Sequence, residues 1–452
     1  MDTDFHFFGT ASAALSSGFS EQDATLIANA AEYVDFFNSD YWSYWSIQDN
    51  QQQEQVKIDF PHLSCQFIDW KMIGDYDDHL WNAFHFPPGN RGHNEQSQLS
   101  DFYIAKASLP YWVNDFKSLH KVRDTNLSPS LKPLLCRPYS PFALHMCLDT
   151  IATFKKLSKA KPEALTDLLA HWVDGAPFVA PKEARNLALI FLGMRMHVLA
   201  DTWAHQDFSG IASKDINSVG TFNYIFASKD ESSILESTQW TGSLWALAED
   251  TDCAVAPNVP GHAACRGHGQ LGHYPDYSWL TFIYPAAWLK EGGYLVRNNP
   301  SEYEQAWYWL RTVMHSCLAS DPAQTEAKPN RHELVPQSIR ECIRTPHQLD
   351  STQLFAVAES EQLWRKLATA NRIQEHKRWN NAVGKFDERQ RKHLGVIDGL
   401  PATRYGTLNV AQDSPLHLME LAATMHYQWC VRWAKAHPEF QWQPLPKHAQ
   451  DT

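Results

Sequence analysis

Residues 187–210 read "LALIFLGMRMHVLADTWAHQDFSG", and this stretch decides the fold class. Its first half is apolar enough for a helix buried in a protein core. Its second half adds His197, Asp201 and His205, each four residues after the one before. Residues four apart lie one turn apart on nearly the same face of an α-helix. The sequence therefore predicts a buried helix with an imidazole, a carboxylate and a second imidazole on one side.

This row of ionisable groups favours a metal site over a packing network. Imidazole nitrogen and carboxylate oxygen are the ligands that Zn²⁺ accepts where thiolates are absent. An unpaired carboxylate is unfavourable in an apolar setting, whereas a bound cation supplies the compensating charge. The alternative is a buried hydrogen-bond network in which Asp201 accepts from neighbouring histidines. Three groups in register favour the metal, because clustered His and carboxylate side chains mark functional sites.

The composition is that of a globular protein and argues against some functions. The chain has 452 residues, of which 44% are hydrophobic and 20% charged. A formal net charge of −12 disfavours a protein that binds duplex nucleic acid, which normally has a basic face. The 18 tryptophans suit a core, and they also suit a pocket for a lipid or another small molecule. None of the eight cysteines forms a C-x-x-C pair, so we expect buried thiols, with a Cys253–Cys265 disulfide as the alternative.

The sequence predicts a cytoplasmic protein. The first residues, "MDTDFHFFGT", have neither the basic nor the apolar segment of a secretory signal. The most apolar stretch, Leu187 to Ala200, is interrupted by Arg195 and His197 and is too short to span a membrane. We therefore expect no transmembrane segment, while export by a signal-free route would leave no mark in the sequence.

Helical periodicity recurs along the chain and convincing β-alternation is rare, so the sequence predicts a mainly α fold, a multi-helix core with long functional loops. A capping box at Ser20–Asp23 starts one helix, and Gly210 marks the expected end of the helix quoted above. Other helices are expected at 141–157, 161–173, 302–317, 351–390 and 414–435. Residues 40–100 and 250–277 are expected to be irregular. The polar stretch 319–346 is expected to link a metal-binding catalytic domain, 1–318, to a helical C-terminal extension, 347–452, that packs on it.

Four further segments contain candidate ligands. Asp4 and His6 are two residues apart, and an extended segment would point both to one side. Asp35 lies near a helix C-terminus, where the helix dipole disfavours an unpaired carboxylate. The remaining candidates lie in the two irregular stretches: His79, His85 and His93 in the first, of which His85 looks most fixed, and His262, His268, His273 and Asp276 in the second. The alternative is a flexible N-terminus for Asp4 and His6, and a solvated surface side chain for Asp35 and for each of the other candidates taken singly.

These motifs resemble the zinc-dependent phospholipase C and single-strand nuclease superfamily. The phrases "DFHFFGT", "YVD" and "GMRMHVLADTWAHQDFSG" look still closer to an uncharacterised bacterial family. The resemblance covers about residues 1–290 and implies a mainly α-helical hydrolase core that holds two to three zinc ions, with Mn or Fe as alternatives. Carried over residue by residue, it implies metal ligands at Asp4, His6, Asp35, His85, His197, Asp201, His205, His273 and Asp276, with His268 as the competitor of His273.

The sequence departs from that superfamily in two places. The superfamily binds a metal through the amino group of a processed N-terminal Trp, whereas Met1 and Asp2 precede the motif here. Either Asp4 replaces that amine, or the third metal is absent. The closing pair, His273 and Asp276, is also three residues apart instead of four.

The preferred function is a metal-dependent hydrolase, a phosphoesterase that acts on a phospholipid or small phosphodiester through a metal-activated water. Asp201 or Asp35 would bridge metals or accept the proton. A third ion, Arg91 or Arg195 would stabilise the leaving oxygen and the phosphoryl charge. One alternative is a non-catalytic helical protein with a structural metal. Another is an HD-type phosphohydrolase, which is disfavoured because the chain has no adjacent His-Asp dipeptide.

Overall fold

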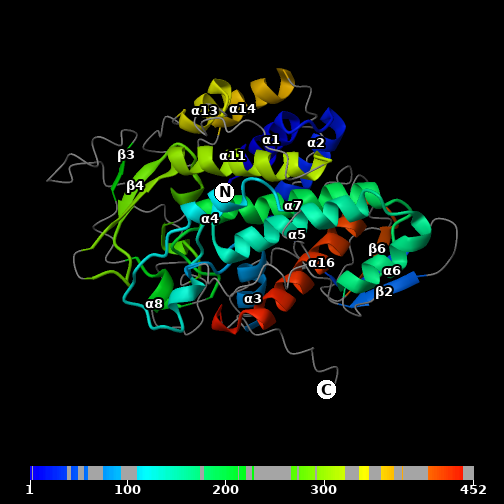
Figure 1. Cartoon of the computed structure of the whole chain (residues 1–452), viewed down its shortest axis with the longest axis horizontal. Coiled ribbons are helices and arrows are strands. Elements are labelled where there is room, and N and C mark those ends of the chain that lie inside the picture. Colours follow the sequence, from blue (N-terminus) through cyan, green and yellow to red (C-terminus); the bar gives the residue numbers. More distant parts are fainter. Residues whose placement is uncertain are drawn as a thin grey trace.

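Helices make up most of the described chain, as the sequence predicts (Figure 1). The computed structural model describes residues 1–2, 4–37, 42–48, 55–59, 75–92, 109–173, 178–211, 213–219, 226–228, 266–271, 274–290, 293–320, 335–345, 358–370, 379 and 406–440. The α-helices within these ranges are α1 Thr10–Ser16, α2 Glu21–Tyr33, α3 Asp75–Phe84, α4 Val113–Leu119, α5 Pro141–Leu157, α6 Pro162–Val173, α7 Ala184–Ala204, α8 Lys214–Asn217, α11 Asn299–Leu318, α13 Gln337–Arg344, α14 Ala358–Ala370 and α16 Pro415–Ala436.

Helix α7 is the centre of the fold. It packs against α2, α5, α11, α16 and α3, and Figure 1 shows it running between them through the middle of the molecule. It is long and apolar enough to cross a membrane by length and composition, but its whole apolar window is buried inside the protein. Packing on all sides therefore accounts for its apolar character.

Local sequence signals explain several helix boundaries. The side chain of Ser20 accepts a hydrogen bond from the backbone N–H of Asp23 at 3.1 Å, which satisfies one of the unpaired N–H groups at the start of α2. Ser140 and Ser414 cap α5 and α16 in the same way. Both helices then begin with proline, which suits the first turn because its missing N–H has no partner there.

Helix α7 ends at Ala204, six residues before the glycine that was expected to stop it. Asp207 has a φ of 75°, so the backbone has already left the helical conformation there. Gly210 has a different role. A Cβ on Gly210 would lie 2.7 Å from the backbone nitrogen of Asn82, so this glycine permits the end of α3 to approach closely.

The short strands were not predicted. β2 Gln55–Asp59, β1 Trp42–Gln48 and β6 Gly406–Ala411 form one sheet, in which β1 pairs antiparallel with β2 and parallel with β6. β3 Phe226–Ser228, β4 Thr281–Tyr284 and β5 Leu295–Asn298 form an antiparallel second sheet. The sheets lie at opposite ends of the helical body (Figure 1). Strands of three to seven residues that pair with distant segments leave little alternation to detect.

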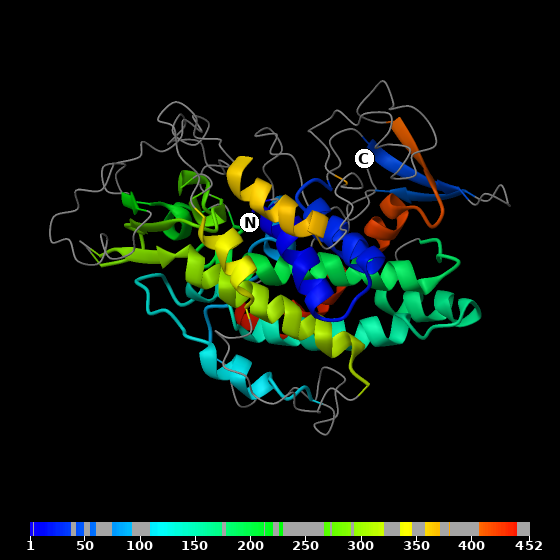
Figure 2. The ribbon, with the colours of Figure 1, turned by 90° about the horizontal axis from the view of Figure 1, so that it is seen from above.

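The hydrophobic core includes residues from both sides of the expected linker. Phe5, Leu192 and Trp433 belong to one buried cluster, so α16 contributes to the core that surrounds α7. The stretch expected to be a linker contains α13, which packs against α11 and α14. Helix α14 in turn packs against the N-terminal residues 4–9, and Figure 2 shows α13 (yellow) and α14 (orange) near the blue N-terminal helices.

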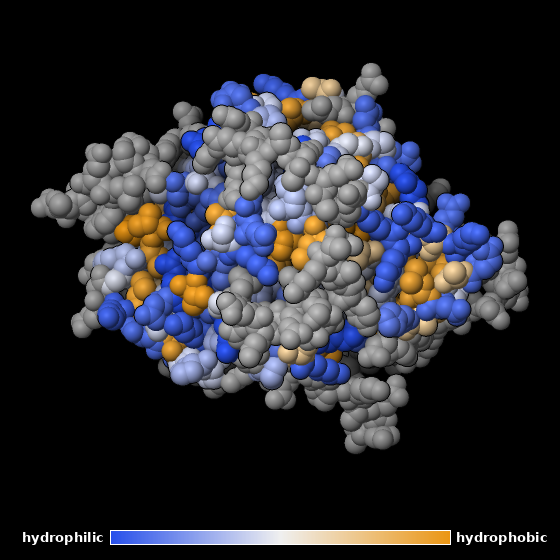
Figure 3. All heavy atoms as spheres, viewed as in Figure 1, coloured by the Kyte–Doolittle hydropathy of each residue, from blue (hydrophilic) through white to orange (hydrophobic). Residues whose placement is uncertain are grey.

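On the face of the molecule shown in Figure 3, apolar side chains form small separate groups among hydrophilic ones.

The cysteines in the described ranges are buried thiols, as expected from the sequence. Cys136, Cys147, Cys317, Cys342 and Cys430 are buried and free. The proposed Cys253–Cys265 pair lies outside the described residues. Residues 351–357, 371–378 and 380–390 of the helix expected at 351–390 lie outside them as well.

The close contact between α7 and α2 gives a first prediction. A Cβ on Gly193 would lie 2.2 Å from the carbonyl oxygen of Ile27, so Gly193→Ala forces α2 away from α7. We expect a loss of about 1–3 kcal/mol in unfolding free energy, although alanine favours helix formation. Denaturant unfolding measures this loss, with Gly92→Ala as control, because among the described residues a Cβ on Gly92 would approach only Val122, at an ordinary contact distance of 3.9 Å. Equal stability of Gly193→Ala and the unaltered protein would contradict the close packing.

A buried glutamate gives a second prediction. Burial raises the pKa of Glu420 from 4.5 to about 7, against the lowering effect of the hydrogen bond that Thr424 donates at 2.9 Å. The folded state therefore holds a proton that the unfolded state releases, so stability falls as the pH rises from 4.5 through about 7. Glu420→Gln should remove this dependence, with little effect at pH ~5 and a gain of about 3 kcal/mol at pH ~8.

Chemical unfolding across this pH range measures the effect. The exposed Glu163→Gln in α6 is the control, because the same change in charge at the surface should alter stability only slightly at every pH. A constant difference between Glu420→Gln and the unaltered protein from pH ~5 to ~8 would contradict the assignment.

Candidate metal centre

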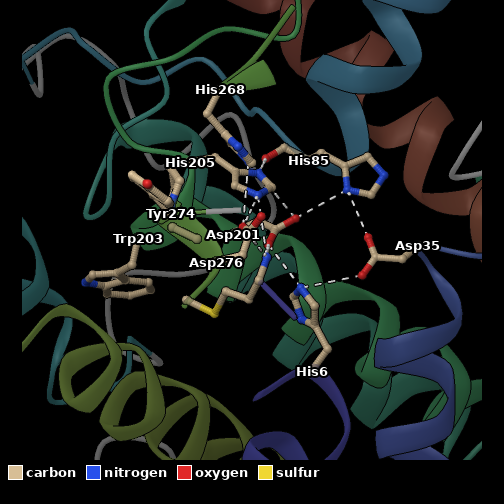
Figure 4. Close-up of polar contacts among 12 residues, drawn as sticks. His6, Asp35, His85, Asp201, Trp203, His205, His268, Tyr274 and Asp276 are labelled. Atoms are coloured by element: carbon tan, nitrogen blue, oxygen red, sulfur yellow. Dashed lines mark hydrogen bonds and ion pairs between the residues drawn. The ribbon is translucent and has the colours of Figure 1, made fainter. Parts of the chain in front are cut away.

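Eight imidazole and carboxylate side chains from distant parts of the chain converge beside α7 (Figure 4). They form three groups, and within each group the ligand atoms lie within 4.8 Å of one another. We name them the N-terminal group (His6, His197, Asp201), the central group (Asp35, His85, His197) and the loop group (His205, His268, Asp276). All eight residues are among the ligands considered from the sequence.

The four-residue spacing places His197, Asp201 and His205 on one side of α7, as the sequence predicts. Nε2 of His197 lies 3.0 Å from Oδ2 of Asp201, and Nδ1 of His205 lies 3.5 Å from the same oxygen. The other side chains reach α7 from outside it. His6 belongs to η1 (Asp4–Gly9), Asp35 follows α2, and His85 follows α3. Asp276 ends the short 3-10 turn η8 (Tyr274–Asp276), and His268 precedes the similar turn η7 (Gly269–Leu271).

The central group has the spacing of ligands around one ion. Nδ1 of His85 lies 3.3 Å from Nε2 of His197, and Oδ1 of Asp35 lies 3.6 Å from each of these nitrogens. Oδ2 of Asp201 is 3.3 Å from His85 and 3.0 Å from His197. Bonds of about 2.0–2.1 Å in a tetrahedral zinc site place ligand atoms about 3.3 Å apart. These four residues therefore fit a shared cation.

The N-terminal group also contains the Met1 amine. Nε2 of His6 lies 3.1 Å from Oδ1 of Asp201 but is not aligned for a hydrogen bond with it. The amine lies 2.9 Å from the same oxygen and 3.3 Å from Oδ1 of Asp276. Burial lowers the pKa of this amine, but the charges of the neighbouring carboxylates outweigh burial and raise it to about 12. An ammonium thus occupies a place that favours positive charge.

The loop group lies on the other side of Asp201. Oδ1 of Asp276 is 3.5 Å from Nε2 of His205 and 3.7 Å from Nε2 of His268. Nδ1 of His205 lies 2.7 Å from the carbonyl oxygen of His85, so this nitrogen carries the proton and donates it. Nε2 is then left with its lone pair directed at the group, the arrangement usual in metal-binding histidines. Phe86 stacks on the His205 ring at 4.4 Å and fixes its plane.

The surroundings favour the neutral form of two histidines in the cluster, His6 and His85, but not of His197. Burial lowers the pKa of His6 well below its usual value, and burial lowers the pKa of His85 as well. Burial also opposes protonation of His197, but the charges of Asp201 and Asp35 outweigh it and raise its pKa. Neutral imidazoles are the form that binds metals.

The carboxylates of Asp201 and Asp35 differ in their surroundings. Burial opposes the ionisation of Asp201, but His205, the Met1 amine and His197 hold its pKa well below its usual value. Burial raises the pKa of Asp35 in spite of its histidine neighbours. The side chain of Asp35 is 35% exposed, whereas those of Asp201, His6 and His197 are fully buried. Asp35 therefore marks the side on which the cluster meets solvent.

The expected extended N-terminal segment is wrong. Residues 4–9 form a π-helix, in which residues two apart point to different sides. His6 consequently joins the cluster, while Asp4 belongs to none of the three groups. Asp4 therefore does not join the cluster in place of an amine, while the Met1 amine lies beside Asp201.

Other candidate residues lie elsewhere. The buried guanidinium of Arg195 donates to Asp149 at 3.1 Å and lies 4.5 Å from the ring centre of Trp429. It precedes His197 by two residues and so faces a different side of α7. Arg91 is half-buried, and its carbonyl oxygen accepts from His120 at 2.7 Å. His93, His262, His273 and the side chain of His79 lie outside the described residues.

The family comparison covers nearly the whole chain. Residues 1–434 match the family described as "Family of unknown function (DUF6765)". The chain belongs to this family. No curated protein and no solved structure matches the chain. For this DUF6765 protein, the buried His and Asp groups are therefore the main indication of function, and they are groups that could hold metal ions.

The three groups of candidate metal ligands give a third prediction, which concerns the stability of the protein with and without zinc. A cation that binds the folded state and not the unfolded state stabilises by up to about 4 kcal/mol at 1,000 times its Kd. Zinc added to chelator-treated protein should therefore raise the unfolding temperature by several degrees. His197→Gln should abolish most of this increase, because His197 belongs to two groups. His315→Gln in α11, outside the cluster, is the control, and an equal zinc effect in both variants would refute the site.

Proposed function

We propose that this protein is a metal-dependent hydrolase of phosphate esters. The observation that supports the proposal is the convergence of eight nitrogen and oxygen ligands into three adjacent groups around one buried aspartate. Two or three zinc ions in such a cluster would activate a water for attack and offset the charge of a phosphoryl group. Zinc is favoured because its usual ligands are imidazole and carboxylate, and Mn or Fe would also accept this set.

Asp201 has the role of joining the groups. Oδ1 lies beside His6, and Oδ2 lies beside both His85 and His197, so its two oxygens face different groups. A carboxylate in this position holds neighbouring ligand groups at a fixed separation. It also remains ionised, because its pKa lies well below the usual value. Asp201 would therefore serve as a ligand shared between groups, and it is a poor acceptor for a proton.

Asp35 is better suited to accept the proton of an attacking water. Its side chain is the most exposed of the ion-paired carboxylates in the cluster, at 35%, and burial raises its pKa. A base with a raised pKa holds a proton more readily than an ordinary carboxylate. The half-buried Trp81 lies 4.9 Å from the His85 ring and supplies apolar surface on this side. A phospholipid or a small phosphodiester fits this combination, in line with the net charge of −12.

The likeness to the zinc-dependent phospholipase C and single-strand nuclease superfamily supports the same proposal. Of the implied ligand positions, Asp4 lies outside the three groups and His273 lies outside the described residues. The others all lie in the three groups, and so does His268, the competitor of His273. This agreement concerns residue types and their grouping, and it is the reason for naming phosphate esters as the substrate class.

A structural metal in the N-terminal group is the second candidate. Its three side chains are fully buried, and closed coordination without room for water is typical of structural zinc. An ion there would strengthen the core without taking part in hydrolysis. It would exchange slowly with added metal, whereas ions next to Asp35 would exchange quickly.

Elemental analysis together with an activity assay tests the proposal. Purified protein should contain two to three metal equivalents and hydrolyse bis(p-nitrophenyl) phosphate or phosphatidylcholine. Asp201→Asn should lose metal and activity, and Asp35→Asn should lower kcat by about 100-fold or more. Asp23→Asn in α2, whose carboxylate pairs with Arg185, is the control outside the cluster. Protein that holds no metal even after reconstitution would overturn the proposal.

A further inference from the structure

The junction between β5 and α11, residues 297–303, contacts the segments that carry two of the three ligands of the loop group, His205 and Asp276. Four of its side chains are polar and largely or fully buried: Arg297, Asn299, Glu302 and Tyr303. None of them belongs to the three groups of candidate ligands. Arg297, Asn299 and Tyr303 donate hydrogen bonds to backbone carbonyl groups near His205 and Asp276, and Glu302 accepts from Arg297.

Arg297 holds the end of α7. Its Nη2 donates to the carbonyl oxygens of Trp203 at 2.9 Å and Ala204 at 3.0 Å, and its Nη1 donates to that of Gln206 at 3.1 Å. The last carbonyl groups of a helix have no partner within the helix, so one guanidinium satisfies two of them and also the carbonyl group of Gln206, just beyond the end of α7. Glu302 accepts from Arg297 at 2.9 Å and balances its charge. The peptide groups on both sides of His205 are thereby fixed.

Tyr303 and Asn299 hold the turn that contains Asp276. The Tyr303 hydroxyl lies 2.7 Å from the carbonyl oxygen of Asp276, to which it donates. Nδ2 of Asn299 donates to the carbonyl oxygens of Tyr274 and Tyr277, each at 2.8 Å. A three-residue turn has few hydrogen bonds of its own, so these bonds from α11 determine where the Asp276 carboxylate lies.

We propose that this junction is a positioning device that sets the separation between His205 and Asp276, and with it the metal affinity of the loop group. The inference rests on the proposed function, because it assumes that the loop group binds a metal. It assigns no catalytic role to the junction. The two ligands come from different segments and lie 3.5 Å apart, measured from Asp276 Oδ1 to His205 Nε2, and the junction bonds to the backbone of both segments. Partners that orient metal ligands typically change affinity by about 10–100-fold.

The effect should be selective. The ligands of the N-terminal and central groups come from the middle of α7, from η1 and from the segments after α2 and α3. The hydrogen bonds described for the junction side chains go to none of these segments. A loosened junction should consequently weaken one class of bound metal and leave the others as they are. A residue that acts only on overall stability would weaken all classes alike or none.

Tyr303→Phe tests the inference with a small change. It keeps the ring, which packs edge-on against Phe5 at 4.9 Å, and removes only the hydroxyl. Tyr139→Phe is the matched control, because the Tyr139 hydroxyl also donates to a partner in α11, Gln305 at 2.7 Å, without reaching the turn. Zinc affinity is measured by competition with a chromophoric chelator, and the number of retained equivalents by elemental analysis after gel filtration.

We expect Tyr303→Phe to weaken one class of zinc by at least about 10-fold and to leave the remaining equivalents unchanged. Tyr139→Phe should bind zinc like the unaltered protein, even if both variants unfold at a similarly lowered temperature. Arg297→Lys, which keeps the charge but cannot donate to three carbonyl groups, should lose affinity in the same class. It also serves as the second variant if Tyr303→Phe does not fold.

Two outcomes would overturn the inference, and they can be told apart. Unaltered protein that binds zinc while both junction variants keep every class of affinity would overturn the positioning role alone. A uniform loss across all classes would do the same, because it indicates general destabilisation. Unaltered protein without any bound zinc would overturn both this inference and the proposed function.

Discussion

The buried carboxylate of Asp201 is the constraint on which the rest of the structure depends. It lies on a helix that is surrounded by other helices, and its side chain is fully shielded from solvent. A carboxylate in such a place is strongly unfavourable unless opposite charge and hydrogen-bond donors surround it. Imidazoles from η1, from the segment after α3 and from α7 itself lie within 3.5 Å of its oxygens, and so does the Met1 amine. The positions of these segments follow from that requirement.

The packing around α7 serves the same end. Gly193 lets α2 approach so closely that the turn after α2 brings Asp35 to within 3.6 Å of His197. Gly210 lets the end of α3 approach, and His85 follows that end directly. Closely packed interiors transmit small displacements, so the distances within the cluster depend on contacts one or two turns away. The ligand geometry is thus a property of the helix packing as much as of the ligands.

The sequence predicts the parts of this arrangement that depend on local rules. The four-residue spacing on α7, the Ser20 cap and the proline at the start of α5 depend on neighbours along one helix. The N-terminal segment was predicted wrongly, because a D-x-H pattern fits an extended chain and the segment is a π-helix. The junction residues gave no signal at all. Arg297 and Tyr303 act through carbonyl oxygens that lie far from them in sequence, and no residue type marks such a partner.

Burial of charge on α7 does not by itself indicate a metal, and Arg195 shows the difference. Its guanidinium is as buried as Asp201, yet Asp149 neutralises it and the Phe191 and Trp429 rings flank it. The Asp149 carboxylate thus balances the Arg195 charge without another ion, although Nε and Nη1 of Arg195 have no hydrogen-bond partner among the described residues. The cluster has three carboxylates, of which Asp201 and Asp276 contact the Met1 ammonium, while burial keeps His6 and His85 from taking up protons. The ammonium leaves part of the carboxylate charge unbalanced, and, against the effect of burial, the raised pKa of His197 reflects this excess. A bound cation would supply the balance that Asp149 gives to Arg195.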